Sequence, residues 1–151
     1  MGKLRPVGVS PETLAGAWRE LGREFVGVDG TIKPDVARLS QIMYSADGYM
    51  CVVNAPVERK ALDQAAGAVN LDSVSAEIRA EAALGVVAYA GRYEIEGDFV
   101  RHIIYTALNP NLIGTRQPRR AEIVGDDLTL CTTPDAQGNF YRIRWRRADK
   151  M

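Results

Sequence analysis

The sequence predicts an all-β fold, an eight-stranded up-and-down antiparallel barrel, with a short N-terminal helix and one short helix between the third and fourth strands. Eight segments of about four to eleven residues carry the alternating or continuously apolar pattern of strands. Most of these segments are joined by short turns that contain glycine or asparagine rather than by helices. This pattern favours a barrel over an α/β domain, in which helices would alternate with the strands.

The chain begins with a helix-start signal. Ser10 can cap a helix and Pro11 suits the first helical position. Gly16 follows so soon that this helix must be short. The first strand is expected from Ala17 to Val28, and Gly22 is expected to bend it.

The second and third strands are predicted from Arg38 to Tyr44 and from Tyr49 to Asn54. If Tyr44 pairs with Tyr49, then Ile42 lies opposite Cys51 and Met43 opposite Met50. Both faces of these strands are apolar, so the set that points inward stays open.

Residues Ala55 to Val74 have no clear hydrophobic period, and Ser75 to Leu84 combine a capping serine with good helix formers. A connection of this length in a compact domain is either disordered or functional, and its position between two strands would suit a lid. We therefore interpret Ala55 to Val74 as an irregular loop and the following segment as the second helix.

The central hairpin runs from Val86 to Ala107. With Gly97 and Asp98 as its two turn residues, Tyr93 lies opposite His102, and the only histidine of the chain points inward. The residues expected on this inward face are Tyr89, Gly91, Tyr93, Ile95, Val100, His102 and Ile104.

The last three strands are predicted from Gly114 to Val124, from Leu128 to Thr132 and from Phe140 to Arg147. A two-residue turn at Gly125 and Asp126 places Ala121 opposite Leu130 and Arg119 opposite Thr132 on one inward face. Arg119 then enters the barrel, while Arg120 stays outside.

Composition narrows the function classes. A chain of 151 residues is most simply one domain, spanning residues 1–151. Its nineteen basic and nineteen acidic residues cancel, so neither nucleic acid nor a membrane surface is an expected partner.

The N-terminus lacks the apolar run of a signal peptide, which predicts a cytoplasmic protein. One histidine and two distant cysteines, Cys51 and Cys131, predict no metal site, and no glycine-rich phosphate loop or cofactor is expected.

Six segments in consistent order resemble the small lipocalin-like domain family of the calycin type. They are LAGAW at Leu14 to Trp18, YSADGYM at Tyr44 to Met50, AYAGRYE at Ala88 to Glu94, the His102 strand, NPNLIGTRQ at Asn109 to Gln117 and DLTL at Asp127 to Leu130. The resemblance implies a barrel that a helix closes at one end and that has a cavity opening at the other. It does not imply one activity, because similar barrels serve as binders and as cofactor-free cyclases.

Two interior charges are expected. Glu20 stands where the family usually has an apolar residue, and it shares the inward face of Trp18. Arg119 requires a carboxylate from Glu20 or Glu24, or an anionic ligand group, to offset its burial. The alternative is structural, because in calycin barrels a basic side chain often covers the tryptophan near the closed end. Arg119, Arg144 and Arg146 are the candidates for that role.

These residues lead to a binding barrel as the first functional hypothesis, with a small apolar or amphipathic molecule that has a polar or anionic end as its ligand. The candidate ligand-binding residues are Tyr89, Tyr93, His102, Ile104, Arg119 and Leu130. The alternative is a cofactor-independent cyclase or isomerase of polyketide-like biosynthesis, with Glu20 and His102 as catalytic residues. A third hypothesis is self-association through outer residues such as Met43 and Met50, so the chain is expected to be a monomer or a homodimer.

Overall fold

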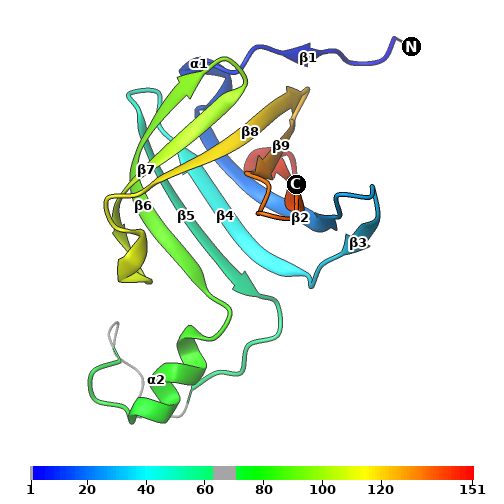
Figure 1. Ribbon diagram of the computed structural model, residues 1–151. Helices are drawn as coiled ribbons and strands as arrows, with labels where there is room; N and C mark the ends of the chain where they lie inside the picture. Colours follow the sequence, from blue (N-terminus) through cyan, green and yellow to red (C-terminus); the bar gives the residue numbers. More distant parts are fainter. Residues whose placement is uncertain (1, 63–70) are drawn as a thin grey trace.

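The computed structural model describes residues 2–62 and 71–151 (Figure 1). Within these residues, eight strands form a closed antiparallel barrel in the order β8-β7-β6-β5-β4-β2-β10-β9, which β9 closes by pairing with β8. Their bounds are β2 (Gly16–Val26), β4 (Arg38–Tyr44), β5 (Tyr49–Pro56), β6 (Val87–Glu96), β7 (Phe99–Ala107), β8 (Arg116–Val124), β9 (Asp127–Thr132) and β10 (Phe140–Arg147). The predicted all-β barrel is confirmed.

Short elements flank the barrel. Strand β1 (Pro6–Val7) pairs with β8, and β3 (Ile32–Pro34) pairs with β2. The described part of the chain also contains the helices α1 (Pro11–Leu14) and α2 (Ala76–Ala83) and the 3₁₀ turns η2 (Pro110–Leu112) and η3 (Ala148–Lys150). Among the described residues, no helix is long and apolar enough to span a bilayer. The predicted irregular loop overlaps the end of β5, and its residues 63–70 lie outside the described part of the chain.

Two hairpins have the register that the sequence predicts. Tyr93 pairs with His102, and Arg119 pairs with Thr132. The β4–β5 hairpin differs by one residue, because Tyr44 pairs with Met50. The Ser45 N–H donates to the Tyr49 carbonyl at 2.8 Å, so the loop holds three residues. The resulting inward set is Ser40, Ile42, Tyr44, Met50, Val52 and Asn54, all of which are buried.

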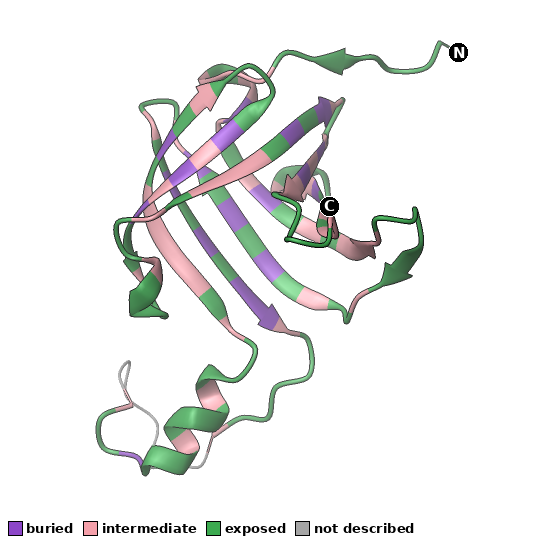
Figure 2. Cartoon of the chain, viewed as in Figure 1, coloured by how far each residue is buried: buried purple, intermediate pink, exposed green. Residues whose placement is uncertain are grey.

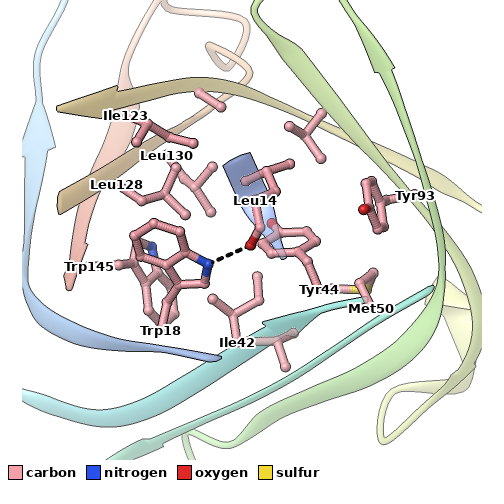
Figure 3. Packing of buried hydrophobic residues seen from close by; sticks show 13 residues of the cluster. Leu14, Trp18, Ile42, Tyr44, Met50, Tyr93, Ile123, Leu128, Leu130 and Trp145 are labelled. Atoms are coloured by element: carbon pink, nitrogen blue, oxygen red, sulfur yellow. Dashed lines mark hydrogen bonds between the residues drawn. The ribbon is translucent and has the colours of Figure 1, made fainter. Parts of the chain in front are cut away.

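Burial alternates along the strands, most clearly in β4 and β5 (Figure 2). The inward residues of all eight strands and Leu14 of α1 fill the closed half of the barrel. Trp18 is fully buried there, and its Nε1 donates to the Leu14 carbonyl at 2.9 Å (Figure 3). Helix α1 therefore closes this end of the barrel.

Arg147 covers Trp18 at the closed end. Its guanidinium carbon lies 4.2 Å from the centre of the indole, and its nitrogens donate to the Thr13 and Ala15 carbonyls. This arrangement combines a cation–π contact with hydrogen bonds to the end of α1. The sequence-based prediction of Arg119, Arg144 or Arg146 for this role was wrong. Arg147 lies two residues after the buried Trp145 and shares its face of β10, whereas Arg144 and Arg146 lie on the opposite face.

A bulge in β2 changes which side chains face inward. Trp145 pairs with Glu20 while the preceding Arg144 pairs with Gly22, so Leu21 has no partner on β10 and is 39% exposed. A bulge of this kind reverses the alternation of the residues that follow it. As a result Glu20 and Arg23 both point into the barrel.

Candidate functional site

A cavity of about 170 Å³ occupies the barrel interior at the end opposite α1. Every barrel strand contributes to it. The residues that line it are Arg23, Ile42, Val52, Asn54, Val87, Tyr89, His102, Arg119, Leu130, Thr132, Tyr141, Ile143 and Trp145. An apolar cavity of roughly 150 Å³ holds one benzene molecule. The cavity therefore accommodates a group about the size of one ring.

His102 is the centre of a row of three polar side chains in the interior. Its Nε2 lies 2.8 Å from the Tyr44 hydroxyl, and its Nδ1 lies 2.9 Å from the Tyr89 hydroxyl. Burial lowers the pKa of His102 from 6.5 to about 3, and the positive charge of Arg119 acts in the same direction. The imidazole is therefore neutral at physiological pH, so one ring nitrogen donates a hydrogen bond and the other accepts one.

Both tyrosines of the row keep their hydroxyl hydrogens. Burial raises the pKa of Tyr44 well above its usual value. Burial also raises the pKa of Tyr89, although the charge of Arg119 and hydrogen bonding to it pull that pKa in the opposite direction. The Arg119 guanidinium thus lies beside the Tyr89 end of the row.

Arg119 lines the cavity without a carboxylate within 4.0 Å among the described residues. Its Nη1 donates to the Pro118 carbonyl at 2.8 Å. The carboxylates that the sequence analysis offered as partners are engaged elsewhere, because Glu24 binds Arg142 and Glu20 binds Arg23. Arg119 therefore keeps an unneutralised positive charge in the cavity wall.

Glu20 and Arg23 form a two-bond ion pair on the inward side of β2. The nitrogen–oxygen distances are 2.7 and 2.8 Å, and the two side chains are 1% and 11% exposed. Glu20 does lie inward, as expected from its spacing to Trp18. Gly22 marked a bend at this point, as expected, but the sequence did not show that the bulge at Leu21 would reverse the faces of the strand. Arg23 was missed because regular alternation would have turned it outward.

The remaining candidate residues divide into two groups. Tyr89, His102, Arg119 and Leu130 line the cavity. Tyr93 and Ile104 are buried but do not line it, and the Tyr93 hydroxyl donates to the Ser45 carbonyl at 2.6 Å. Sequence reasoning missed Tyr44 as a partner of His102, and it missed Trp145, whose buried Nε1 has no hydrogen-bond partner within residues 2–62 and 71–151. Among the described residues, no cluster of His, Cys, Asp and Glu is arranged to hold a metal ion.

A larger hollow of about 740 Å³ lies over the outer face of β4 to β7. Exposed side chains such as Met43, Tyr49 and Tyr105 border it. Arg92 is its only charged lining residue in the described part of the chain. This outer groove is open and apolar, so it offers little to orient a polar ligand.

A closed eight-stranded barrel with one plugged end and an interior cavity at the other defines the class of lipocalin-like barrels. Residues 15–148 match the model of the lipocalin-like domain, and the chain belongs to that family. A search of curated proteins found no significant match. The lipocalin-like fold thus supports the assignment of the chain to a family of binding proteins.

Proposed function

We propose that this barrel binds a small, largely apolar molecule with a polar or anionic end in its interior cavity. The observation that carries the proposal is the Arg119 guanidinium, which lines the cavity without a carboxylate partner among the described residues. Arg119 is half-buried, and removing a charge from water is costly unless the charge is paired. An anionic ligand group would supply the missing partner.

The cavity walls support an apolar body for the ligand. Val52 and Leu130 are buried, and Ile42, Val87 and Ile143 complete the apolar lining. Burial of apolar surface contributes roughly 25 cal/mol per Å², so a single ring adds a few kcal/mol. The volume of about 170 Å³ limits the enclosed part to one ring or a short chain. Benzoate combines such a ring with one negative charge, and it is a suitable probe.

Calorimetry with benzoate tests the proposal. The chain offers a matched pair of arginines, because Arg119 lines the cavity and Arg120 pairs with Asp98 outside the barrel. We expect Arg119→Gln to weaken benzoate binding at least roughly tenfold, since it removes a charge-assisted hydrogen bond. Arg120→Gln should bind benzoate as the unaltered protein does. Equal weakening in both variants, or no binding by the unaltered protein, would contradict the proposal.

The cyclase or isomerase hypothesis has less support. Both Glu20 oxygens accept from Arg23, and both His102 nitrogens contact tyrosine hydroxyls. Either group would have to break such a bond before it exchanged a proton with a substrate. A gene neighbourhood of biosynthetic enzymes would favour catalysis. A cytoplasmic location and a monomeric or homodimeric state likewise stay predictions.

A further inference from the structure

The row of Tyr44, His102 and Tyr89 contains one hydrogen more than its internal hydrogen bonds use. Each hydroxyl has one hydrogen and the neutral imidazole has one on nitrogen, while the row contains two internal hydrogen bonds. One hydroxyl hydrogen must therefore point away from the row. Its position depends on which ring nitrogen carries the proton.

The two ends of the row differ in their surroundings. Tyr44 is almost completely buried against Tyr93 and the core, and His102 Nε2 is its one hydrogen-bond partner among the described residues. A spare hydrogen at Tyr44 would be buried without an acceptor, which is the costly arrangement for a donor. Tyr89 instead lines the cavity, where a ligand oxygen can accept its hydrogen.

The burial of Tyr44 thus decides which group is the donor in each of the two hydrogen bonds of the row. Tyr44 donates to Nε2 of His102, and Nδ1–H donates to the Tyr89 oxygen. Arg119 also acts on this oxygen, since its charge and hydrogen bonding oppose the effect of burial on the pKa of Tyr89. Donation from Nδ1–H to the Tyr89 oxygen polarises the Tyr89 O–H bond and makes it a stronger donor.

We propose that Tyr89 and Arg119 form a two-donor clamp that selects ligands whose polar end is an acceptor oxygen, such as a carboxylate or a ketone. This inference rests on the proposed binding function and specifies the chemistry of its ligand. Trp145 also lines the cavity, and its buried Nε1 has no hydrogen-bond partner among the described residues. An ammonium group placed at this clamp would face the Arg119 cation and the Tyr89 hydroxyl donor, and it has no acceptor to offer them.

Nuclear magnetic resonance of the ligand-free protein tests which nitrogen of His102 carries the proton, and therefore which groups donate within the row. The chain has one histidine, so ¹⁵N-histidine labelling of the tag-free protein reports on His102 alone. We expect the proton on Nδ1, which is the minor tautomer of free histidine in water. A proton on Nε2 would place the spare hydrogen at Tyr44 and overturn the clamp, whether or not any ligand binds.

Binding of ring-sized probes tests the selectivity. We expect benzoate and acetophenone to bind and benzylamine to bind at least roughly tenfold more weakly, because it offers no acceptor. Tyr89→Phe should weaken acetophenone binding roughly fivefold to tenfold, as expected for one hydrogen bond. Tyr93→Phe is the matched control, since the Tyr93 hydroxyl bonds to Ser45 outside the cavity, and it should bind acetophenone normally.

The outcomes separate the two proposals. If benzylamine binds as tightly as benzoate, or if Tyr89→Phe binds acetophenone normally, the clamp is wrong while binding in the cavity stands. If none of the three probes binds the unaltered protein, the proposed function fails together with the clamp.

Discussion

Glu20 and Arg119 are interior charges with opposite situations. Glu20 is fully neutralised by Arg23 through two short hydrogen bonds, whereas Arg119 has no carboxylate partner among the described residues. A paired interior charge supports the fold, and an unpaired one is available to a ligand. The structure therefore gives different roles to two residues whose pairing was one of the alternatives that the sequence left open.

Glu20→Gln should destabilise the protein by about 3–5 kcal/mol, because it leaves the buried Arg23 without its partner. Glu24→Gln is the matched control, since its ion pair with Arg142 has side chains that are 24% and 35% exposed. We expect about 1 kcal/mol or less for this control. Urea unfolding of both variants at neutral pH measures the difference. Equal losses of stability in the two variants would show that the Glu20–Arg23 ion pair contributes no more to stability than the more exposed Glu24–Arg142 pair.

His102 should make stability depend on pH. Its pKa is about 3 in the folded protein and 6.5 in the unfolded chain, so between these values the unfolded chain binds more protons. The free energy of unfolding should therefore fall as pH decreases from 6.5 towards 3, by at most about 1.4 kcal/mol per pH unit from this group. Urea unfolding at pH 7 and pH 4.5 measures the loss.

His102→Gln is the comparison for that measurement. Carboxylates also titrate below pH 5, and the variant retains their contribution while it removes that of the imidazole. The variant should lose less stability than the unaltered protein between pH 7 and pH 4.5. The same pH dependence in both proteins would mean that His102 is protonated as easily in the folded state as in the unfolded chain.

The residues of the site could be predicted where strands alternate regularly. Tyr89, His102, Arg119 and Leu130 line the cavity, and each was expected to point inward from the period of its strand. Tyr44 and Arg23 could not be assigned in this way. The orientation of Tyr44 depended on the length of a turn, and that of Arg23 depended on a bulge.

At the scale of elements, the hairpin of β6 and β7 depends on a close approach of its two strands. The register shifts between Ala90 and Gly91. A Cβ atom on Gly91 would lie 1.9 Å from the Ile103 carbonyl oxygen, well inside any allowed contact. Only glycine fits at this bulge, beside the strand that carries His102.

Gly91→Ala should therefore destabilise the protein severely, by roughly 3 kcal/mol or more, because the backbone of β7 must move. Gly22→Ala is the matched control, since its added Cβ meets the Arg144 side chain at an ordinary 3.6 Å. We expect the control to change stability by about 1 kcal/mol at most. Thermal unfolding monitored by circular dichroism compares the two variants. A tolerated Gly91→Ala would show that the strands are further apart than described.

Turn length explains which elements could be predicted in register. The turns at Gly97 and Gly125 each hold two residues, and both hairpins pair as their sequences indicate. The turn between β4 and β5 holds three residues and has Gly48 at a φ of 96°, a geometry that the sequence SADG does not distinguish from a two-residue or four-residue loop. A difference of one residue in the length of this turn exchanges the inward and outward faces of β5 relative to β4.

At the scale of the whole molecule, the outer groove on β4 to β7 is the main alternative to the interior cavity as the site of a small apolar ligand. The outer groove on β4 to β7 has about 740 Å³, while the interior cavity has about 170 Å³. The groove offers more volume and more exposed apolar surface. The cavity offers enclosure, the unpaired Arg119 and the hydrogen-bonded row of His102. Volume alone favours the groove, and the chemistry of an anionic ligand favours the cavity.

The central claim is that an anionic, ring-sized ligand binds inside the barrel. Intermolecular nuclear Overhauser effects between benzoate protons and the methyl groups of the protein test it most directly. We expect contacts to Leu130 and Ile143, which line the cavity, and none to Met43 or Ile103, which line the outer groove. Contacts to Met43 and Ile103 without contacts to Leu130 would place the ligand on the outer surface and contradict the claim.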